Sequence, residues 1–439
     1  MAQTLSLGER LALLLYQALT LVLLPAQPIY LLLRARRSPG YRLHWSERFW
    51  GHAPLATGGP RLWVHAVSVG ETQAVTPLIR EFLLQHPSHQ VLLTHTTITG
   101  RETGAKAFAA ELGTRVLQCY LPYDLPWAVQ RFLVRAAPSL GLLMETEIWP
   151  QLMRACVRRG LPVALINGRL SERSAHKMHQ LAWLARPALR SLRLVVVQAQ
   201  EHAERFQALV PGLPVTVSGS MKFDLPVRED RVALGQQWRA GLAAQRVVLL
   251  ASSREEEESG FLRAWAHQTP SHALLVIVPR HPERFDAVAQ DIARAGLQCL
   301  RRSHWGDASP AVINSSTTVV LGDSLGEMQA YVSLSDCVVV GGSLIPLGGQ
   351  NPIEACAQGR PVVMGPHMFN FPEIARQLVE HGAAQTAQTP EEAIAQCSRW
   401  LTDETAYSQA AASALQLAKA HQGATARTLA VLEANGLLR

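Results

Sequence analysis

Glu71 is the first residue whose position suggests chemistry, because it follows an apolar run that is predicted to be a buried strand. The run Leu62–Val69 leads into Gly70, and Glu71 then opens a stretch with helical periodicity. A carboxylate at the end of a buried strand can act as a general base on a hydroxyl group. The same position also allows a purely structural role, since a glutamate in the first helical turn is stabilised by the positive end of the helix dipole.

A pair of carboxylates follows a second apolar run, Leu140–Met144. Glu145 and Glu147 are two residues apart, and on an extended chain side chains at that spacing point the same way. Removing two acids from water is costly, so a positively charged partner is expected nearby. The acids could form a functional site, or they could pair with a basic residue of the segment 167–173 in a structural role.

Cationic residues and a possible helix cap also follow predicted strands. Lys222 comes after a short apolar run, and Arg280 follows Ala273–Val278 after one proline. A lysine at such a place can stabilise an anionic leaving group, although solvated lysines are also common near linkers, and a guanidinium suits phosphate. Ser324 and Glu327 have the spacing of a capping box, so the simplest interpretation of Glu327 is a helix cap.

The most informative segment is the glycine-rich stretch 341–354, GGSLIPLGGQNPIE, which follows the buried run Val338–Val340. Its glycines would let the backbone approach a ligand closely, and free N–H groups at the start of the next helix could hold a phosphate. Asn351 is expected at the N-cap of that helix, Pro352 at its first position and Glu354 at its third. Glu354 could accept hydrogen bonds from ribose hydroxyls or complete the cap, and both roles can hold at once.

These residues require a scaffold that brings strand ends together. Short β-branched runs that are apolar on both faces alternate with amphipathic stretches, as parallel strands covered by helices do. The predicted strands are Leu62–Val69, Val91–Thr94, Val116–Tyr120, Leu140–Met144, Val163–Ile166, Leu194–Val197, Val215–Val217, Val247–Ala251, Ala273–Val278, Thr318–Leu321, Val338–Val340 and Val362–Met364. The polar segment 223–230 separates two such series. We therefore expect an α/β protein with two doubly wound, Rossmann-like domains facing a cleft, with ligands outside the carboxyl ends of the strands.

Composition excludes several classes of protein. The chain has 439 residues, of which 48% are apolar and 17% charged, as in folded domains rather than disordered chains. The net charge of +7 suits an anionic partner, but the basic residues are dispersed, which argues against nucleic acid. The sequence has no phosphate-loop, dinucleotide, H-E-x-x-H or D-x-D motif, which disfavours ATPases, simple dehydrogenases and zinc hydrolases.

The N-terminal segment is predicted to be a membrane anchor. Residues 11–33 carry no charge, and four arginines follow between 34 and 42. As a helix the apolar part would be about 34 Å long, against about 30 Å of hydrocarbon. Pro25 and Pro28 interrupt it, so we expect a kinked span or a helix that dips into one leaflet, with the rest of the chain in the cytoplasm. A buried core helix is the alternative, and a cleaved signal peptide is disfavoured because no small-residue cleavage site follows.

Taken together, these segments resemble the Kdo (3-deoxy-D-manno-octulosonate) transferases of Gram-negative lipopolysaccharide assembly. The resemblance extends over nearly the whole chain and rests on the motifs HAVSVGET, METEIWP, NGRLSERS, GSMKFD, VPRHPERF, GDSLGEM and GGSLIPLGGQNPIEA, in this order. It implies a GT-B fold, transfer of Kdo with inversion from CMP-Kdo to a lipid A precursor, and no cofactor or metal. The expected organisation is an inner-membrane anchor at 1–36, an acceptor-binding domain at 37–225 and a CMP-sugar-binding domain at 226–439, both domains on the cytoplasmic side.

The resemblance also implies roles for individual residues. Glu71 matches the proton acceptor of the family, and Glu145 and Lys222 match its transition-state stabilisers. The implied CMP contacts are Pro279, Arg280, Leu325, Gly326, Glu327, Asn351, Pro352, Ile353 and Glu354. This assignment agrees with the chemistry, because the acceptor hydroxyl must lose a proton while CMP leaves with growing negative charge.

Two other functions remain alternatives at this point. The first is another GT-B enzyme, a transferase or an epimerase, that uses a UDP-sugar. The second is a nucleotide-sugar-binding protein without turnover. Tighter binding of UDP than of CMP would favour the first, and binding without product formation would favour the second.

Overall fold

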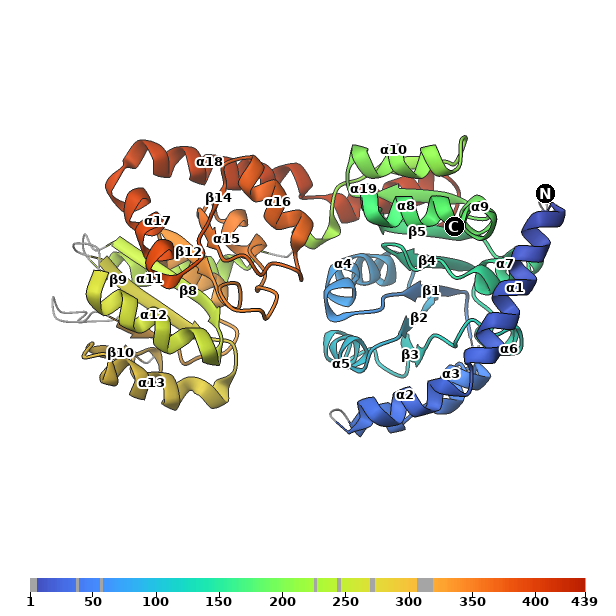
Figure 1. The fold of residues 1–439 in the computed structure, drawn as a ribbon, viewed down its shortest axis with the longest axis horizontal. Coiled ribbons are helices and arrows are strands. Elements are labelled where there is room, and N and C mark those ends of the chain that lie inside the picture. Colours follow the sequence, from blue (N-terminus) through green and yellow to red (C-terminus); the bar gives the residue numbers. More distant parts are fainter. Residues whose placement is uncertain are drawn as a thin grey trace. The chain divides into compact units, whose positions relative to one another are not determined.

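The computed structural model describes residues 6–36, 39–55, 58–224, 227–242, 246–268, 273–305 and 319–438. The chain divides into two compact units, which are Met1–Asp224 with His421–Arg439, and Leu225–Ala420 (Figure 1). Each unit contains one parallel seven-stranded sheet, so the predicted α/β class with two doubly wound domains is confirmed. The sequence placed all residues after 226 in the second domain, whereas in the structure the last helix belongs to the first unit.

The sheet of the first unit reverses its strand order at β1. Its order is β3-β2-β1-β4-β5-β6-β7, and β1 pairs in parallel with both β2 and β4. The strands are β1 (Arg61–His65), β2 (Gln90–His95), β3 (Val116–Tyr120), β4 (Leu140–Met144), β5 (Val163–Gly168), β6 (Leu194–Val197) and β7 (Val215–Val217). In doubly wound sheets, ligands bind outside the carboxyl ends of the strands at such a reversal. The loops after β1 and β4 are therefore the expected place for chemistry.

Helices cover both faces of this sheet (Figure 1). On one face the buried core includes side chains of α4 (Val69–Gln85) and α19 (Ala424–Ala434). On the other face it includes side chains of α6 (Pro126–Ala136), α7 (Pro150–Arg158), α9 (Ala182–Arg190) and α10 (Gln200–Leu209). The remaining elements of the unit are α1 (Leu7–Leu23), α2 (Ala26–Ala35), η1 (Pro39–Arg42), α3 (Trp45–Trp50), α5 (Ile98–Ala107), α8 (Glu172–Gln180) and η2 (Met221–Phe223). Because both faces are covered, the strands are apolar on both sides, as the sequence indicated.

The second unit repeats this plan, with the reversal at β8. The strand order is β10-β11-β9-β8-β12-β13-β14, and β8 pairs with both β9 and β12. The strands are β8 (Arg246–Ser253), β9 (Ala273–Pro279), β10 (Cys299–Arg301), β11 (Val319–Leu321), β12 (Cys337–Val340), β13 (Val362–Met364) and β14 (Ala384–Thr386). The helical elements are α11 (Glu229–Ala240), α12 (Glu255–Gln268), η3 (Pro282–Arg284), α13 (Phe285–Arg294), η4 (Arg302–His304), α14 (Met328–Leu334), α15 (Ile353–Ala357), α16 (Pro372–Glu380), α17 (Pro390–Thr402) and α18 (Glu404–His421).

The predicted strands are present, but some of their ends differ. The run predicted to extend to Val69 stops at His65, because Ser68 caps α4 by accepting a hydrogen bond from the Glu71 N–H. The edge strands β10 and β14 were not predicted. Each is three residues long and mostly outside the core, so no apolar run marks it. Thr318, the first residue of another predicted strand, lies outside the described residues.

The N-terminal apolar segment forms two helices that meet at a bend of 52°. Pro25 lies at the bend, whereas Pro28 is accommodated in the first turn of α2, where its missing N–H has no helical partner to lose. Of the helices described, no single one is long and apolar enough to cross a membrane, but α1 and α2 together pass that test. Leu13 is the one buried residue of α1, and most of the other leucines of α1 are exposed. A core helix would bury most of its leucines, so the exposure of the α1 leucines disfavours the alternative that α1 is a buried core helix.

The last helix of the chain is fastened to the turn η2 through Asp224. The Asp224 carboxylate accepts hydrogen bonds from the backbone N–H groups of Gly423, at 2.6 Å, and Thr425. The ring of Phe223 stacks on the ring of His421 with 4.5 Å between centroids. Asp224 therefore caps α19, although it lies about two hundred residues earlier in the chain.

We expect Asp224→Ala to loosen α19 by about 1–2 kcal/mol, because two N–H groups at its start lose their acceptor. Hydrogen exchange of the α19 amides should accordingly become about 5–30-fold faster. Asp403→Ala is the matched control, since Asp403 caps α18 by accepting from the Ala406 N–H at 3.0 Å. The control should leave exchange in α19 unchanged, and unchanged exchange of α19 in Asp224→Ala would contradict the role of Asp224.

Candidate active site

Glu71 lies in the first turn of α4, just after β1, and its carboxylate is held by two hydrogen bonds. It accepts from the Val67 N–H at 2.8 Å and from the Ser68 Oγ at 3.0 Å. The residue is only 8% exposed. The carboxylate therefore has a fixed orientation, and its place in the first turn also satisfies the structural role that the sequence allowed.

The pKa of Glu71 is raised to about 7, chiefly because the carboxyl group is buried. The negative charge of Glu145 raises the pKa further, whereas the hydrogen bonds from Val67 and Ser68 act in the opposite direction. A carboxyl group with a pKa near neutrality exchanges a proton readily at physiological pH, which is what a general base requires. The influence of Glu145 also means that the two carboxylates lie near each other.

Glu145 stands at the end of β4 in a left-handed backbone conformation. Its φ is +57°, and its N–H donates to the Ile166 carbonyl at 3.1 Å. The chain turns immediately afterwards, and the Glu147 N–H donates back to the Met144 carbonyl at 3.3 Å. The prediction that Glu145 and Glu147 follow each other on an extended chain is therefore wrong. Non-glycine residues are rare in this conformation, and they often occur where a side chain must be aimed for function.

The cation that compensates Glu145 is Lys222, which lies on η2. Its Nζ is 2.7 Å from Glu145 Oε1, and both side chains are about one fifth exposed, at 19% and 20%. No ion pair of the described residues joins Glu145 to the segment 167–173, which was the structural alternative. The structure thus brings together Glu71, Glu145 and Lys222, which the sequence had identified in three separate motifs.

Asn167 positions the turn that carries Lys222, and the sequence assigned it no role. It is fully buried at the end of β5, with φ of +50°. Its Oδ1 accepts from the Met221 N–H at 3.0 Å, and its carbonyl accepts from Gln198 Nε2 at 3.0 Å. An asparagine directly after a buried strand tolerates the left-handed conformation better than most residues, and this was the available signal.

In the second unit, Arg280 and Glu354 lie within electrostatic reach of each other. Arg280 follows β9, and its N–H donates to the Ser253 carbonyl at 3.0 Å. Burial raises the pKa of Glu354, and the positive charge of Arg280 opposes that rise. Glu354 Oε2 is buried, and among the described residues it has no hydrogen-bond partner. It is an acceptor that a ligand hydroxyl could satisfy.

Within the described part of the chain, the side chain of Asn351 at the start of α15 forms a hydrogen bond with the backbone, whereas that of Glu354 does not. The Asn351 Oδ1 accepts from the Ile353 N–H at 3.0 Å. The helix starts at Ile353 with Pro352 at its N-cap, so the prediction that Asn351 is the N-cap is wrong by one residue. No hydrogen bond among the described residues joins the Glu354 carboxylate to the helix start, so the capping alternative for Glu354 is not supported. With only five residues, α15 has a weak dipole. A bound phosphate would therefore be met mainly by cationic side chains.

The loop with Ser324 and Glu327 also differs from its predicted role. α14 begins only after Glu327, so Ser324 is not its N-cap. The Glu327 carboxylate accepts instead from Arg302 Nη2 at 3.0 Å and lies 3.6 Å from Arg231 Nη1. Leu325, in contrast, is 71% exposed. Glu327 is therefore held in place by ion pairs and not by a capping box.

The glycines of the 341–354 segment are explained by contacts within the chain. A Cβ on Gly341 would lie 2.3 Å from the Ser252 carbonyl oxygen. Gly349 has φ of +69°, and its N–H donates to the Gly342 carbonyl at 2.8 Å. The sequence assigned the close approach to a ligand, whereas at Gly341 the closely approached group is the backbone of β8.

Arg254 is a second cation near Arg280 that the sequence analysis missed. It follows β8, at the reversal of the second sheet, and its Nη1 lies 2.8 Å from His281 Nε2. A Cβ on Gly342 would lie 3.3 Å from Arg254 Cγ. The same signal that identified Arg280, a basic residue soon after a buried strand, also applies to Arg254. The described residues contain no group of three or more histidines, cysteines or acids that could hold a metal ion.

The two doubly wound units have a GT-B-like fold, with the acids Glu71 and Glu145 beside a lysine in the first unit and cations beside glycine-rich loops in the second. Solved structures with this fold include the glycotransferase of kitacinnamycin, with a TM-score of 0.53 and 16% identity over 86% of this chain and 99% of that chain. MurG of Acinetobacter baumannii has a TM-score of 0.53 and 13% identity over 85% and 99%. At such identities the likeness concerns the fold alone.

The sequence relatives identify the family. The sequence-family model described as 3-deoxy-D-manno-octulosonic-acid transferase (kdotransferase) matches residues 43–225 of this chain. The chain is 42% identical over 414 residues to the 3-deoxy-D-manno-octulosonic acid transferase of Bordetella pertussis, covering 91% of this chain and 94% of that one. It is 35% identical over 371 residues to the transferase of the same name from Haemophilus influenzae, covering 83% and 84%. The protein belongs to the 3-deoxy-D-manno-octulosonic acid (Kdo) transferases, which confirms the resemblance, and it is a glycosyltransferase.

We expect Asn167→Ala to destabilise the first unit by about 2–4 kcal/mol, because the Met221 N–H loses its acceptor and alanine is strained at a positive φ. Asn167→Gly removes the same hydrogen bond without the strain and should cost about 1 kcal/mol less. Denaturant titration of both variants measures the difference. Equal stability of the two variants would show that the backbone of residue 167 carries no strain.

Proposed function

We propose that the protein transfers Kdo from CMP-Kdo to a hydroxyl group of a lipid A precursor, with inversion, and that Glu71 is the general base. The observation that carries this proposal is the Glu71 carboxylate, which is buried, fixed by two hydrogen bonds and raised in pKa to about 7. Membership of the Kdo transferases indicates that the transferred sugar is Kdo, since the relatives are named for its transfer.

In the proposed reaction, Glu71 accepts the proton of the acceptor hydroxyl as that oxygen attacks the anomeric carbon of Kdo. The bond from the anomeric carbon to the phosphate oxygen breaks, and its electron pair leaves with CMP. A single displacement of this kind inverts the anomeric configuration. Lys222 stabilises the negative charge that develops, and Glu145 orients the lysine through the 2.7 Å ion pair.

The second unit is proposed to bind the CMP part of the donor. Arg280 and Arg254 suit the single phosphate, because a guanidinium can donate two parallel hydrogen bonds to it. The unsatisfied Oε2 of Glu354 suits a ribose hydroxyl. The other contacts remain those implied by the family motifs: Pro279, Leu325, Gly326, Glu327, Asn351, Pro352 and Ile353.

A lipid acceptor also gives a role to the exposed leucines of α1 and α2. We place these helices at the cytoplasmic face of the inner membrane, with α1 dipping into one leaflet. The support for this placement is the long run of exposed apolar side chains, for which Leu14, Leu15 and Val22 are examples at 58%, 63% and 75% exposure. The acceptor-binding role falls to the same unit, because Glu71 lies in it.

We expect Glu71→Gln to bind CMP normally but to lower kcat by about 10²–10⁴-fold, since the glutamine cannot accept the proton. The assay is mass spectrometry of the product formed from CMP-Kdo and a lipid A precursor in detergent. The base works only when deprotonated, so kcat/KM of the wild type should fall about tenfold per pH unit below about pH 7. Turnover of Glu71→Gln near the wild-type level would return Glu71 to its structural role.

The like charge of Glu145 provides a control for this pH dependence. In Glu145→Gln that charge is absent, so the pKa of Glu71 should fall and the acidic limb of kcat/KM should move to lower pH. The lower absolute rate of this variant does not affect the comparison, because the midpoint of the limb is the quantity measured. A limb that stays at the same pH would mean that a group other than Glu71 titrates.

We expect Arg280→Ala to weaken CMP binding by about 10–150-fold in calorimetry, because a charge-assisted contact to phosphate contributes on the order of 1.5–3 kcal/mol. Glu354→Ala should weaken it less and leave the melting temperature unchanged. Arg263→Ala is the matched control, since Arg263 is exposed on α12 and forms no ion pair with any described residue. Tighter binding of UDP than of CMP by the wild type would instead select the alternative of a UDP-sugar enzyme.

A further inference from the structure

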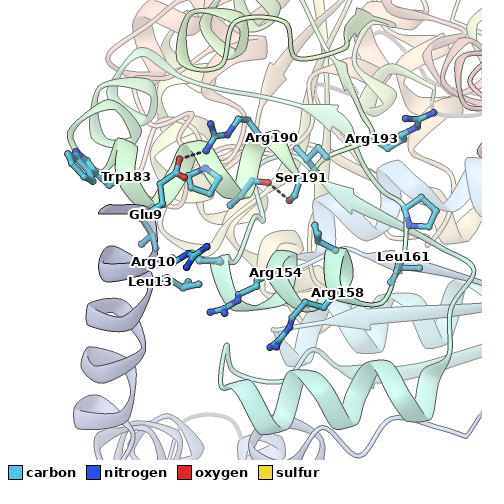
Figure 2. Close-up of a pocket in the computed structure, with 18 residues that line it drawn as sticks. Glu9, Arg10, Leu13, Arg154, Arg158, Leu161, Trp183, Arg190, Ser191 and Arg193 are labelled. Carbon is cyan, nitrogen blue, oxygen red and sulfur yellow. Dashed lines mark hydrogen bonds and ion pairs between the residues drawn. The ribbon is translucent and has the colours of Figure 1, made fainter. Parts of the chain in front are cut away.

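A pocket of about 790 Å³ lies between α1, α7 and α9 of the first unit (Figure 2). Its lining includes residues 160–162 and 191–193, which lead into the amino ends of β5 and β6. Glu71, Glu145 and Lys222 follow the carboxyl ends of strands in the same sheet. The pocket is therefore at the opposite edge of the sheet from the candidate active site.

Arginines dominate the charge of this pocket. Five line it, against a single carboxylate from Glu9: Arg10, Arg154, Arg158, Arg190 and Arg193. Glu9 pairs with Arg190. In the part of the chain that the structure describes, no ion pair joins Arg154, Arg158 or Arg193 to a carboxylate. Figure 2 shows Arg10 and Arg154 extending into the space between α1 and the body of the unit, whereas Arg193 lies at the far side.

The grouped positive charges act on one another. The pKa of Arg154 is lowered, first by burial and then by the positive charges of Arg158 and Arg10. A lowered pKa means that the charged form of Arg154 is less favoured here than it is for an arginine in water. An anion bound beside these guanidinium groups would remove that penalty, and phosphate suits them best because it accepts paired hydrogen bonds.

The rest of the lining is apolar and continues onto an exposed apolar helix. Leu13, Leu161 and Leu184 line the pocket beside the arginines. Trp183 lies at its rim, 65% exposed, and its ring packs on α1 so closely that a Cβ on Gly8 would overlap it. A tryptophan that is largely exposed beside apolar surface is typical of a membrane interface. The combination suits a ligand with a phosphate at one end and hydrocarbon at the other.

We propose that this pocket binds the headgroup phosphate of an anionic glycerophospholipid, with the acyl chains lying along the exposed leucines of α1. The phosphate lies among Arg10, Arg154 and Arg158. This inference rests on the membrane placement proposed above, and it assigns a second lipid to the protein, distinct from the acceptor lipid that reacts near Glu71. A free phosphate offers the same chemistry to the arginines, so the test must separate the two sources.

The test measures binding of the full chain to phosphatidylcholine vesicles with and without phosphatidylglycerol. In Arg154→Gln/Arg158→Gln the gain in binding due to phosphatidylglycerol should fall on the order of 30-fold, at about 1 kcal/mol for each basic side chain. The control is Arg131→Gln/Arg263→Gln, which removes the same charge from exposed arginines outside the pocket. An equal loss in the control pair would overturn the proposal in favour of diffuse surface charge.

Soluble ligands separate the lipid from free phosphate. Calorimetry with monomeric dihexanoyl-phosphatidylglycerol should show binding that the Arg154→Gln/Arg158→Gln variant loses, while dihexanoyl-phosphatidylcholine and inorganic phosphate bind at least tenfold more weakly. Inorganic phosphate that binds as tightly as the short-chain lipid would overturn the lipid assignment.

Activity in detergent keeps this inference separate from the proposed function. Kdo transfer to a dispersed lipid A precursor should be unchanged in Arg154→Gln/Arg158→Gln, and a raised KM for that acceptor would assign the pocket to the acceptor and overturn the second-lipid proposal. If the wild type forms no Kdo product but still binds phosphatidylglycerol through these arginines, the proposed function fails and the lipid site stands.

Discussion

The ion pair between Glu145 and Lys222 is the interaction on which the chemistry of the first unit depends. Two carboxylates stand at the ends of the neighbouring strands β1 and β4, where each charge is costly to keep out of water. Lys222 compensates one of them directly, because its Nζ lies 2.7 Å from Glu145 Oε1. The pKa of Glu71 is raised to about 7, first by burial and then by the negative charge of Glu145. The ion pair thus links the strength of the base to the position of the lysine.

The position of the lysine depends in turn on distant parts of the chain. Asn167 holds the turn η2 from β5, and Asp224 fastens the end of that turn to α19. These contacts explain why a strained backbone is retained at Glu145 and Asn167, since each aims a polar group at the same small region. The sheet supplies the common edge, because parallel strands present all their carboxyl ends on one side.

Much of the fold could be predicted because its strands are apolar on both faces. The runs that form β3, β4 and β6 were predicted with their observed bounds. The edge strands β10 and β14 could not be, since three residues at the rim of a sheet need no apolar pattern. Glu71, Glu145, Lys222 and Arg280 were identified from their places after strands, whereas the other CMP contacts were implied by the family resemblance. The pairing of Glu145 with Lys222 was not predicted, because it joins residues far apart in the sequence through tertiary structure. The left-handed backbone at Glu145 has no sequence signal at all, since glutamate has no preference for that conformation.

The return of the chain to the first unit has a consequence for synthesis on the ribosome. The polypeptide leaves this unit after Asp224 and re-enters it at His421, so the helix that covers part of its core is made after the second unit. Until α19 emerges, apolar side chains of α4 such as Val75 and Leu78, and the turn that bears Lys222, lack one of their packing partners. The first unit can therefore be completed only after the second unit has been translated, and the turn that bears Lys222 gains its contact with α19 only then.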